Sequence, residues 1–252
     1  MTQATEVLIP TSAAEAASAF GDGSGVTVIA GGTIVVPDIT YGRLKPEKAL
    51  LLTRAGLSGV TSNGTTVTIG AGTPVQGLVD LPAPLGSCAA NVADLEIRSQ
   101  GTLGGNLCAG PGPDAPRGDL QGPLLALGAV ARSTGAGGER TEPLEDFLED
   151  RGNRLLLDVS FEDPAAGAFE AIDYPHTHEY TVLAVSGARA SDGTLRLAAT
   201  GLADHARLLS GDPEAAAGEV PLDNDALASS WYRAKVLPVL VRRVLAELEE
   251  ST

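Results

Sequence analysis

The sequence predicts an α+β fold in two parts, and three observations point to it. Short strand-like and helix-like segments alternate up to about residue 150, strand-like segments dominate from 155 to 200, and a long amphipathic helix closes the chain. With 252 residues, 43% of them hydrophobic, the chain can bury a sizeable core. We therefore expect one domain over residues 1–150 and a second, mostly antiparallel one over residues 151–252.

The first part begins with a strand, a helix and a second strand. Residues 6–9 are expected to form a short strand, and Thr11 and Ser12 are suited to cap an alanine-rich helix that ends at Phe20 before a glycine. The β-branched run at 26–30 predicts a buried strand that ends in a Gly-Gly pair.

The remaining elements follow in chain order. Apolar residues at Leu85, Val92 and Ile97 have helical spacing, whereas the Gly- and Pro-rich stretch 101–119 is typical of a loop. The strands from 155 onward are expected to form a separate sheet. The predicted strands are 49–53, 66–70, 129–133, 155–161, 180–188 and 194–200, and the predicted helices are 73–80, 85–97, 120–127 and 223–249.

Charge and cysteine content exclude several classes of protein. The net charge of −15 argues against binding to nucleic acid or anionic lipid. No apolar run reaches the roughly 20 residues that span a bilayer, and the N-terminus does not resemble a signal peptide. Two cysteines, Cys88 and Cys108, are too few to hold an iron–sulfur cluster alone. We expect a cytoplasmic protein that binds no metal.

The first motif that carries chemistry is the end of the second strand, where residues 28–33 read Val-Ile-Ala-Gly-Gly-Thr. A sharp turn of this kind exposes successive backbone N–H groups, which form a concavity suited to a pyrophosphate. The alternative is a plain glycine turn between strands. The Rossmann and Walker A patterns are both absent.

The second motif is a further Gly-Gly turn, in which residues 96–107 read Glu-Ile-Arg-Ser-Gln-Gly-Thr-Leu-Gly-Gly-Asn-Leu. Thr102 and Asn106 flank the glycines and can hydrogen-bond a phosphate or ribityl chain while the backbone approaches it closely. Two such turns in one domain predict a long diphosphate ligand that is held at two places.

Together these motifs resemble the FAD-binding medium subunit of the molybdenum hydroxylases, the xanthine dehydrogenase and carbon monoxide dehydrogenase group. The family's first loop reads approximately Ala-Gly-Gly-Thr/His-Asp/Ser, and its second reads Ile-Arg-Asn-x-Ala-Thr-Ile-Gly-Gly-Asn. Residues 30–34 read Ala-Gly-Gly-Thr-Ile, and residues 97–106 read Ile-Arg-Ser-Gln-Gly-Thr-Leu-Gly-Gly-Asn. The family's Pro-x-x-Asp and Leu-Gly-Ala are matched at 116–119 and 127–129, and its closing Tyr-Arg and Arg-Arg helix at 231–243.

The resemblance implies a two-part N-terminal α/β FAD-binding domain of the PCMH/VAO type, followed by a C-terminal α+β domain. It implies non-covalent FAD, with Asp119 or, as an alternative, Asp114 at the ribityl chain. The implied partners are an iron–sulfur subunit, a molybdopterin subunit and an electron acceptor such as NAD, a quinone or oxygen. The implied cofactor-binding residues are Ile29, Ala30, Gly31, Gly32, Thr33, Ile34, Thr102, Leu103, Gly104, Gly105, Asn106, Asp119, Leu156 and Asp173.

The chain also departs from the family pattern. Ile34 replaces a usual Asp, Glu or Ser, and Asp173 stands where xanthine dehydrogenases have a lysine close to the flavin. A carboxylate there would disfavour an anionic reduced flavin. His176 and His178 suit either a metal pair or, as we favour, surface histidines. Two alternatives therefore stay open, a stand-alone divergent flavoprotein and a family member that has lost flavin.

Overall fold

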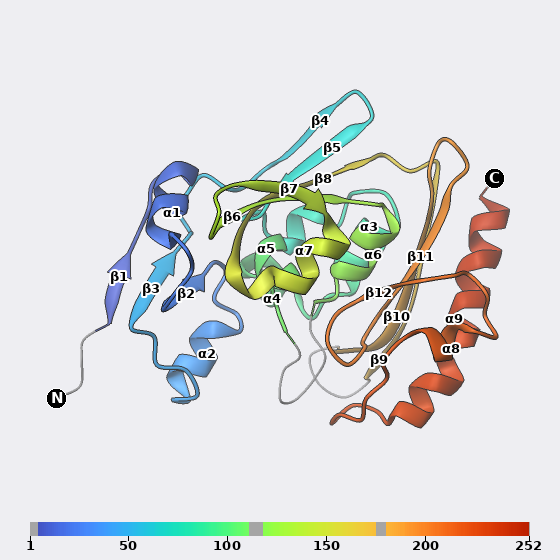
Figure 1. Ribbon diagram of the computed structural model, residues 1–252. Helices are drawn as coiled ribbons and strands as arrows, with labels where there is room; N and C mark the ends of the chain where they lie inside the picture. Colours follow the sequence, from blue (N-terminus) through green and yellow to red (C-terminus); the bar gives the residue numbers. More distant parts are fainter. Residues whose placement is uncertain (1–4, 111–117, 175–179, 252) are drawn as a thin grey trace.

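Three β-sheets stand side by side along the molecule, with helices packed against them (Figure 1). The computed structural model describes residues 5–110, 118–174 and 180–251. The alternative ribityl contact Asp114 and the pair His176 and His178 lie outside these ranges. The mixture of antiparallel sheets, one parallel sheet and a long C-terminal helix confirms the predicted α+β class.

The N-terminal sheet is parallel, with strand order β1-β3-β2. As predicted, Ser12 caps the helix that connects two of its strands, since its hydroxyl accepts a hydrogen bond of 3.1 Å from the N–H of Glu15. A short helix that the sequence did not suggest follows the first glycine turn. The elements are β1 (Glu6–Leu8), α1 (Ala13–Phe20), β2 (Val26–Ile29), α2 (Val35–Thr40) and β3 (Lys48–Leu51).

The central sheet is antiparallel and has the order β4-β5-β8-β6-β7. Its strands are β4 (Val60–Asn63), β5 (Thr66–Gly70), β6 (Val130–Gly135), β7 (Arg140–Pro143) and β8 (Arg154–Glu162). The prediction that 155–161 belongs to the second, separate sheet is wrong, because β8 pairs with β5 and β6. Leu155 and Leu157 pack into the N-terminal core, whereas Leu156 and Val159 pack into the central one. A strand covered on both faces reads as a continuous apolar run, which does not reveal its partners.

The helices of the central part are shorter than predicted. The expected helix 85–97 is two helices, because Val92 is extended, Ala93 has a positive φ of 43°, and Asp94 caps the second helix. The guanidinium of Arg98 braces this break by donating to the carbonyls of Val92 and Ala93 at 3.0 and 2.8 Å. The elements are a 3₁₀ turn at Val75–Leu78, α3 (Leu85–Asn91), α4 (Leu95–Gln100), α5 (Leu103–Leu107), α6 (Gln121–Ala126), α7 (Leu144–Asp150) and a 3₁₀ turn at Arg151–Asn153.

The C-terminal sheet is antiparallel, in the order β12-β11-β10-β9, and α9 covers one face of it (Figure 1). The last helix was expected from residue 223 but begins at Ser230, because the Ser229 hydroxyl caps it. The division at residue 150 stays a prediction, and the pairing of β8 favours a change of sheet after Glu162. The elements are β9 (Ala166–Tyr174), β10 (Tyr180–Arg189), β11 (Leu195–Thr200), β12 (Arg207–Leu209), α8 (Ala216–Glu219) and α9 (Ser230–Glu250).

Candidate cofactor site

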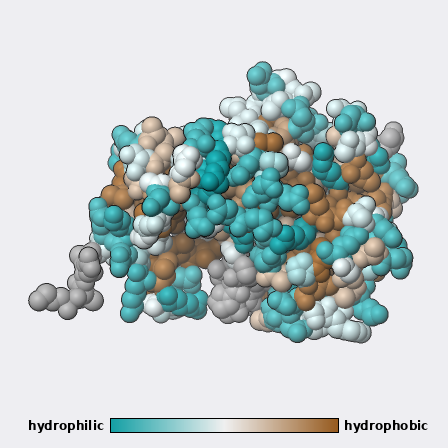
Figure 2. Space-filling view, viewed as in Figure 1, coloured by the Kyte–Doolittle hydropathy of each residue, from teal (hydrophilic) through white to brown (hydrophobic). Residues whose placement is uncertain are grey.

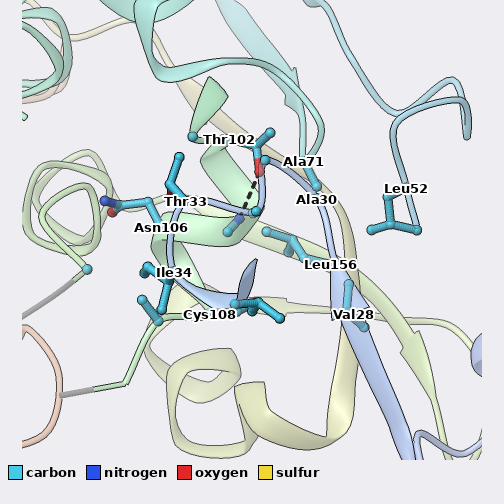
Figure 3. Close-up of a pocket in the computed structure, with 18 of the residues that line it drawn as sticks. Val28, Ala30, Thr33, Ile34, Leu52, Ala71, Thr102, Asn106, Cys108 and Leu156 are labelled. Atoms are coloured by element: carbon cyan, nitrogen blue, oxygen red, sulfur yellow. Dashed lines mark hydrogen bonds between the residues drawn. The ribbon is translucent and has the colours of Figure 1, made fainter. Parts of the chain in front are cut away.

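A cavity of about 580 Å³ lies where the N-terminal sheet meets the central helices and the start of β10. Figure 2 shows hydrophobic surface in the recess between the N-terminal part and the middle of the molecule. The volume falls within the roughly 300–1,000 Å³ that is usual for small-molecule and cofactor sites. Both glycine turns line this cavity, so the two motifs meet at one site (Figure 3).

The two glycine turns also pack against each other, backbone to backbone. A Cβ atom on Gly31 would lie 2.0 Å from the carbonyl oxygen of Gln100 and 2.9 Å from the Cα of Gly101. No side chain fits in that space, so glycine at position 31 is required by the contact between the turns. Gly32 is required for a different reason, since its φ of +75° is one that other residues rarely adopt.

The first turn leaves a row of backbone donors without partners. Among the described residues, no hydrogen bond is donated by the N–H groups of Gly31, Gly32, Thr33 and Ile34. All four residues line the cavity and follow directly on the carboxyl end of a parallel strand. Successive free N–H groups in this position form an anion-binding concavity. The first turn therefore has the chemistry that a phosphate group requires.

In the second turn, four consecutive N–H groups are already bonded within the protein. Those of Leu103, Gly104, Gly105 and Asn106 donate to Thr73, Ala71, the Thr102 hydroxyl and the Thr102 carbonyl. A Cβ on Gly105, however, would meet only the Thr102 Oγ1 at 3.1 Å. From Leu103 to Asn106, the second turn thus offers a ligand close approach to its backbone rather than hydrogen-bond donors.

The carboxylate predicted to hold a ribityl chain does reach the cavity. Asp119 lines it and accepts a hydrogen bond of 3.1 Å from the side-chain amide of Asn106, whose Oδ1 accepts from the N–H of Leu120 at 2.9 Å. Burial raises the pKa of Asp119, and the Asn106 hydrogen bond partly opposes that rise. Asn106 is therefore engaged in holding Asp119, a role that its place in the motif did not indicate.

Three of the predicted residues do not line the cavity. Ile29 alternates with the lining residues Val28 and Ala30, and Leu103 is fully buried in the central core. Asp173 accepts a hydrogen bond of 2.9 Å from the amide of Asn91 and contributes nothing to the wall. The other predicted residues within the described chain, Leu156 included, all border the cavity.

Sequence reasoning missed several parts of the wall. An apolar stretch formed by Phe20, Val26, Val28 and Leu52 is one of them, since core residues of a sheet carry no signal that one face is open to a ligand. Arg151, Arg154 and Tyr180 also line the cavity from segments that no motif singled out. Burial raises the pKa of the lining thiol Cys108 to about 12, which keeps it protonated and makes it a poor nucleophile.

Other kinds of site find no support in the described part of the chain. No group of three or more His, Cys, Asp or Glu side chains within it could hold a metal ion. None of its helices is both long and apolar enough to cross a membrane. The fold and the cavity together define the class of the protein, which is a binding protein for an elongated, phosphorylated cofactor.

Comparison with known proteins identifies the family. The model for the FAD binding domain in molybdopterin dehydrogenase matches residues 3–161, and the chain belongs to this family. The chain is 32% identical over 150 residues to the carbon monoxide dehydrogenase medium chain of Hydrogenophaga pseudoflava, a match that covers 55% of this chain and only half of that relative. It is 29% identical over 253 residues to the corresponding chain of Afipia carboxidovorans, with 86% of each covered.

A solved structure shares the fold over the whole chain. Carbon monoxide dehydrogenase from Hydrogenophaga pseudoflava superposes with a TM-score of 0.85 at 24% sequence identity, covering 100% of this chain and 99% of that one. The family confirms FAD as the cofactor. The cavity fits it, since it joins N–H donors that have no partner among the described residues to a half-buried carboxylate and an extended apolar wall.

Proposed function

We propose that this chain is the FAD-binding electron-transfer subunit of a molybdenum hydroxylase-type oxidoreductase. One observation carries the assignment of the site: two glycine turns are locked together by the Gly31 contact at a cavity of about 580 Å³, and four N–H groups of the first turn have no partner among the described residues. Bound FAD supplies redox chemistry that links one-electron and two-electron carriers.

The residues of the chain divide the work of holding the cofactor. The N–H groups of residues 31–34 bind the diphosphate, and Gly105 allows it to approach the second turn. Asp119 accepts hydrogen bonds from the ribityl hydroxyls. The apolar side chains of Leu156 and Leu52 exclude water from the ring systems. No side chain is needed as a general acid or base, because the work of the chain is binding and tuning.

An iron–sulfur subunit and a molybdopterin subunit are the proposed partners, and an acceptor such as NAD, a quinone or oxygen takes the electrons. The support is that two of the relatives are named medium chains of carbon monoxide dehydrogenases. We also place the complex in the cytoplasm, in keeping with the free thiols Cys88 and Cys108.

The test is the visible spectrum of the purified chain, followed by heat release and identification of the cofactor. Flavin bands with about one FAD per chain are expected, and co-expression with the genomically neighbouring subunits should give a stable complex. A colourless protein that does not take up added FAD would refute the proposal.

A further inference from the structure

One cation in the cavity wall has no role in any motif. Arg151 lines the cavity from the turn between α7 and β8. Its guanidinium donates to the carbonyl oxygens of Leu148 and Asp204, the latter at 3.3 Å, and its Nη1 lies 3.4 Å from Nδ1 of His205. The Nε–H is buried and has no hydrogen-bond partner among the described residues. The group is held in place and keeps unused hydrogen-bonding capacity.

The positive charge of Arg151 is also uncompensated within the described residues. No carboxylate there forms an ion pair with it. The two nearby carboxylates are taken by Arg207, which contacts Glu149 and Asp204 at 2.6 Å each. Arg151 is half-buried, and an anionic ligand in the adjoining cavity would give its guanidinium the counter-charge that it lacks.

The second arginine of the wall, Arg154, likewise forms no ion pair among the described residues, but it differs in its hydrogen bonding. Arg154 is 4% exposed and spends four hydrogen bonds on β6 and the turn after it, at Ser133, Ala136 and Gly138. These bonds hold the protein together and leave only one of the five guanidinium N–H groups of Arg154 for a ligand. The chain carries a net charge of −15, so a dinucleotide anion that enters the cavity needs local positive charge. Arg151 is placed to provide it.

We propose that Arg151 binds the negative charge of the cofactor, with His205 of the C-terminal part as its positioning residue. This inference rests on the proposed function. The charge comes from one of two sources, the diphosphate or the ring system after reduction. His205 is 6% exposed, and Arg151, Arg207, Asp204 and Glu149 face it. As a neutral ring, His205 accepts from Arg151 at Nδ1 and donates toward Glu149 at Nε2.

The experiment measures the Kd of FAD and of riboflavin, and the midpoint potential of bound FAD, for the wild type and for Arg151→Gln and Arg151→Lys. If the diphosphate is the source, Arg151→Gln should weaken FAD binding about tenfold or more and leave riboflavin unchanged. If the reduced ring is the source, the affinity for oxidised FAD should hold and the potential should fall by about 30 mV for each tenfold loss of relative affinity for the reduced form. Because lysine keeps the positive charge, Arg151→Lys should retain most of the wild-type FAD affinity and most of the wild-type potential.

Arg140→Gln is the matched control, because it removes the same charge as Arg151→Gln. Arg140 is exposed and lies outside the cavity wall. His205→Ala should shift the same readout in the same direction, and His205→Asn, which keeps an acceptor near Nδ1, should restore it. Unchanged affinities and potential in a folded Arg151→Gln variant overturn the inference, as does an equal loss for FAD and riboflavin. A wild type that binds no FAD refutes the proposed function itself.

Discussion

Gly105 and Gly31 allow the binding role of the glycine turns to be separated from their structural role. A Cβ on Gly105 meets only the Thr102 hydroxyl, at 3.1 Å, so the neighbour must yield by a few tenths of an ångström. That weakens the Thr102 cap by about 1 kcal/mol at most, and removing a glycine from α5 returns up to about 1 kcal/mol. The free energy of unfolding of Gly105→Ala should therefore stay close to that of the wild type.

Binding should respond very differently. The added methyl of Gly105→Ala occupies space at the cavity wall that a bound diphosphate would use, and the two further carbons of Gly105→Val occupy more. We expect FAD affinity to fall about tenfold or more for Gly105→Ala and further for Gly105→Val. A tenfold fall corresponds in free energy to the loss of about one charge-assisted hydrogen bond. Titration of flavin fluorescence gives the affinity, and thermal unfolding of the cofactor-free chain gives the stability.

Gly31→Ala is the structural counterpart, because its Cβ would sit 2.0 Å from a backbone oxygen that cannot move away alone. It should lower the stability by several kcal/mol and yield little folded protein. Gly32→Val is a poorer probe, since strain at φ +75° and a 3.0 Å contact with Val36 confound it. Undiminished FAD affinity in a folded Gly105→Val variant would refute the placement of the diphosphate at the second turn.

Three further results are expected. Asn106→Ala should leave Asp119 without its 3.1 Å hydrogen bond and weaken FAD binding several-fold, as measured by fluorescence titration, and an unchanged affinity would count against Asp119 as a ligand. Arg233→Met should destabilise the chain by about 3–5 kcal/mol in chemical denaturation, because Arg233 is 1% exposed and pairs with Asp225 at 2.7 Å. Burial lowers the pKa of His205, so the stability that depends on its neutral form is complete above the unfolded-state value near 6.5 and is lost as pH falls through the lower folded-state value. His205→Asn should flatten the pH dependence of Tm in that window, and an identical slope in wild type and variant would contradict this.

The parts of the fold that could be predicted from sequence are those with a local cause. The cap at Ser12, the strand that ends before the Gly31 turn and the apolar stripe of α9 each depend on neighbours a few residues away. The sheet to which β8 belongs could not be predicted, because pairing with β5 joins residues about 90 positions apart. The break at Ala93 depends on Arg98 reaching back to it, which no periodicity records.

The candidate site also has parts that could be predicted from the sequence and parts that could not. Gly-Gly pairs revealed where the backbone approaches a ligand, but could not show that position 31 serves packing and position 105 faces open space. The place of Arg151 in the cavity wall could not be predicted from the sequence, because only the fold brings it next to His205 and the cavity. Charge that is unpaired only after folding leaves no pattern in the sequence.

The wall of the cavity draws on all three parts of the fold. Leu52 comes from the N-terminal core, Val75 from the central core, and the exposed Tyr180 from the start of the C-terminal sheet. A ligand seated there is linked thermodynamically to the docking of the three parts. Free FAD at a hundredfold excess over its Kd would add about 2.7 kcal/mol to the stability of the native state. In a chain of ordinary marginal stability, a contribution of that size would make flavin supply a determinant of how long newly made copies of the chain survive.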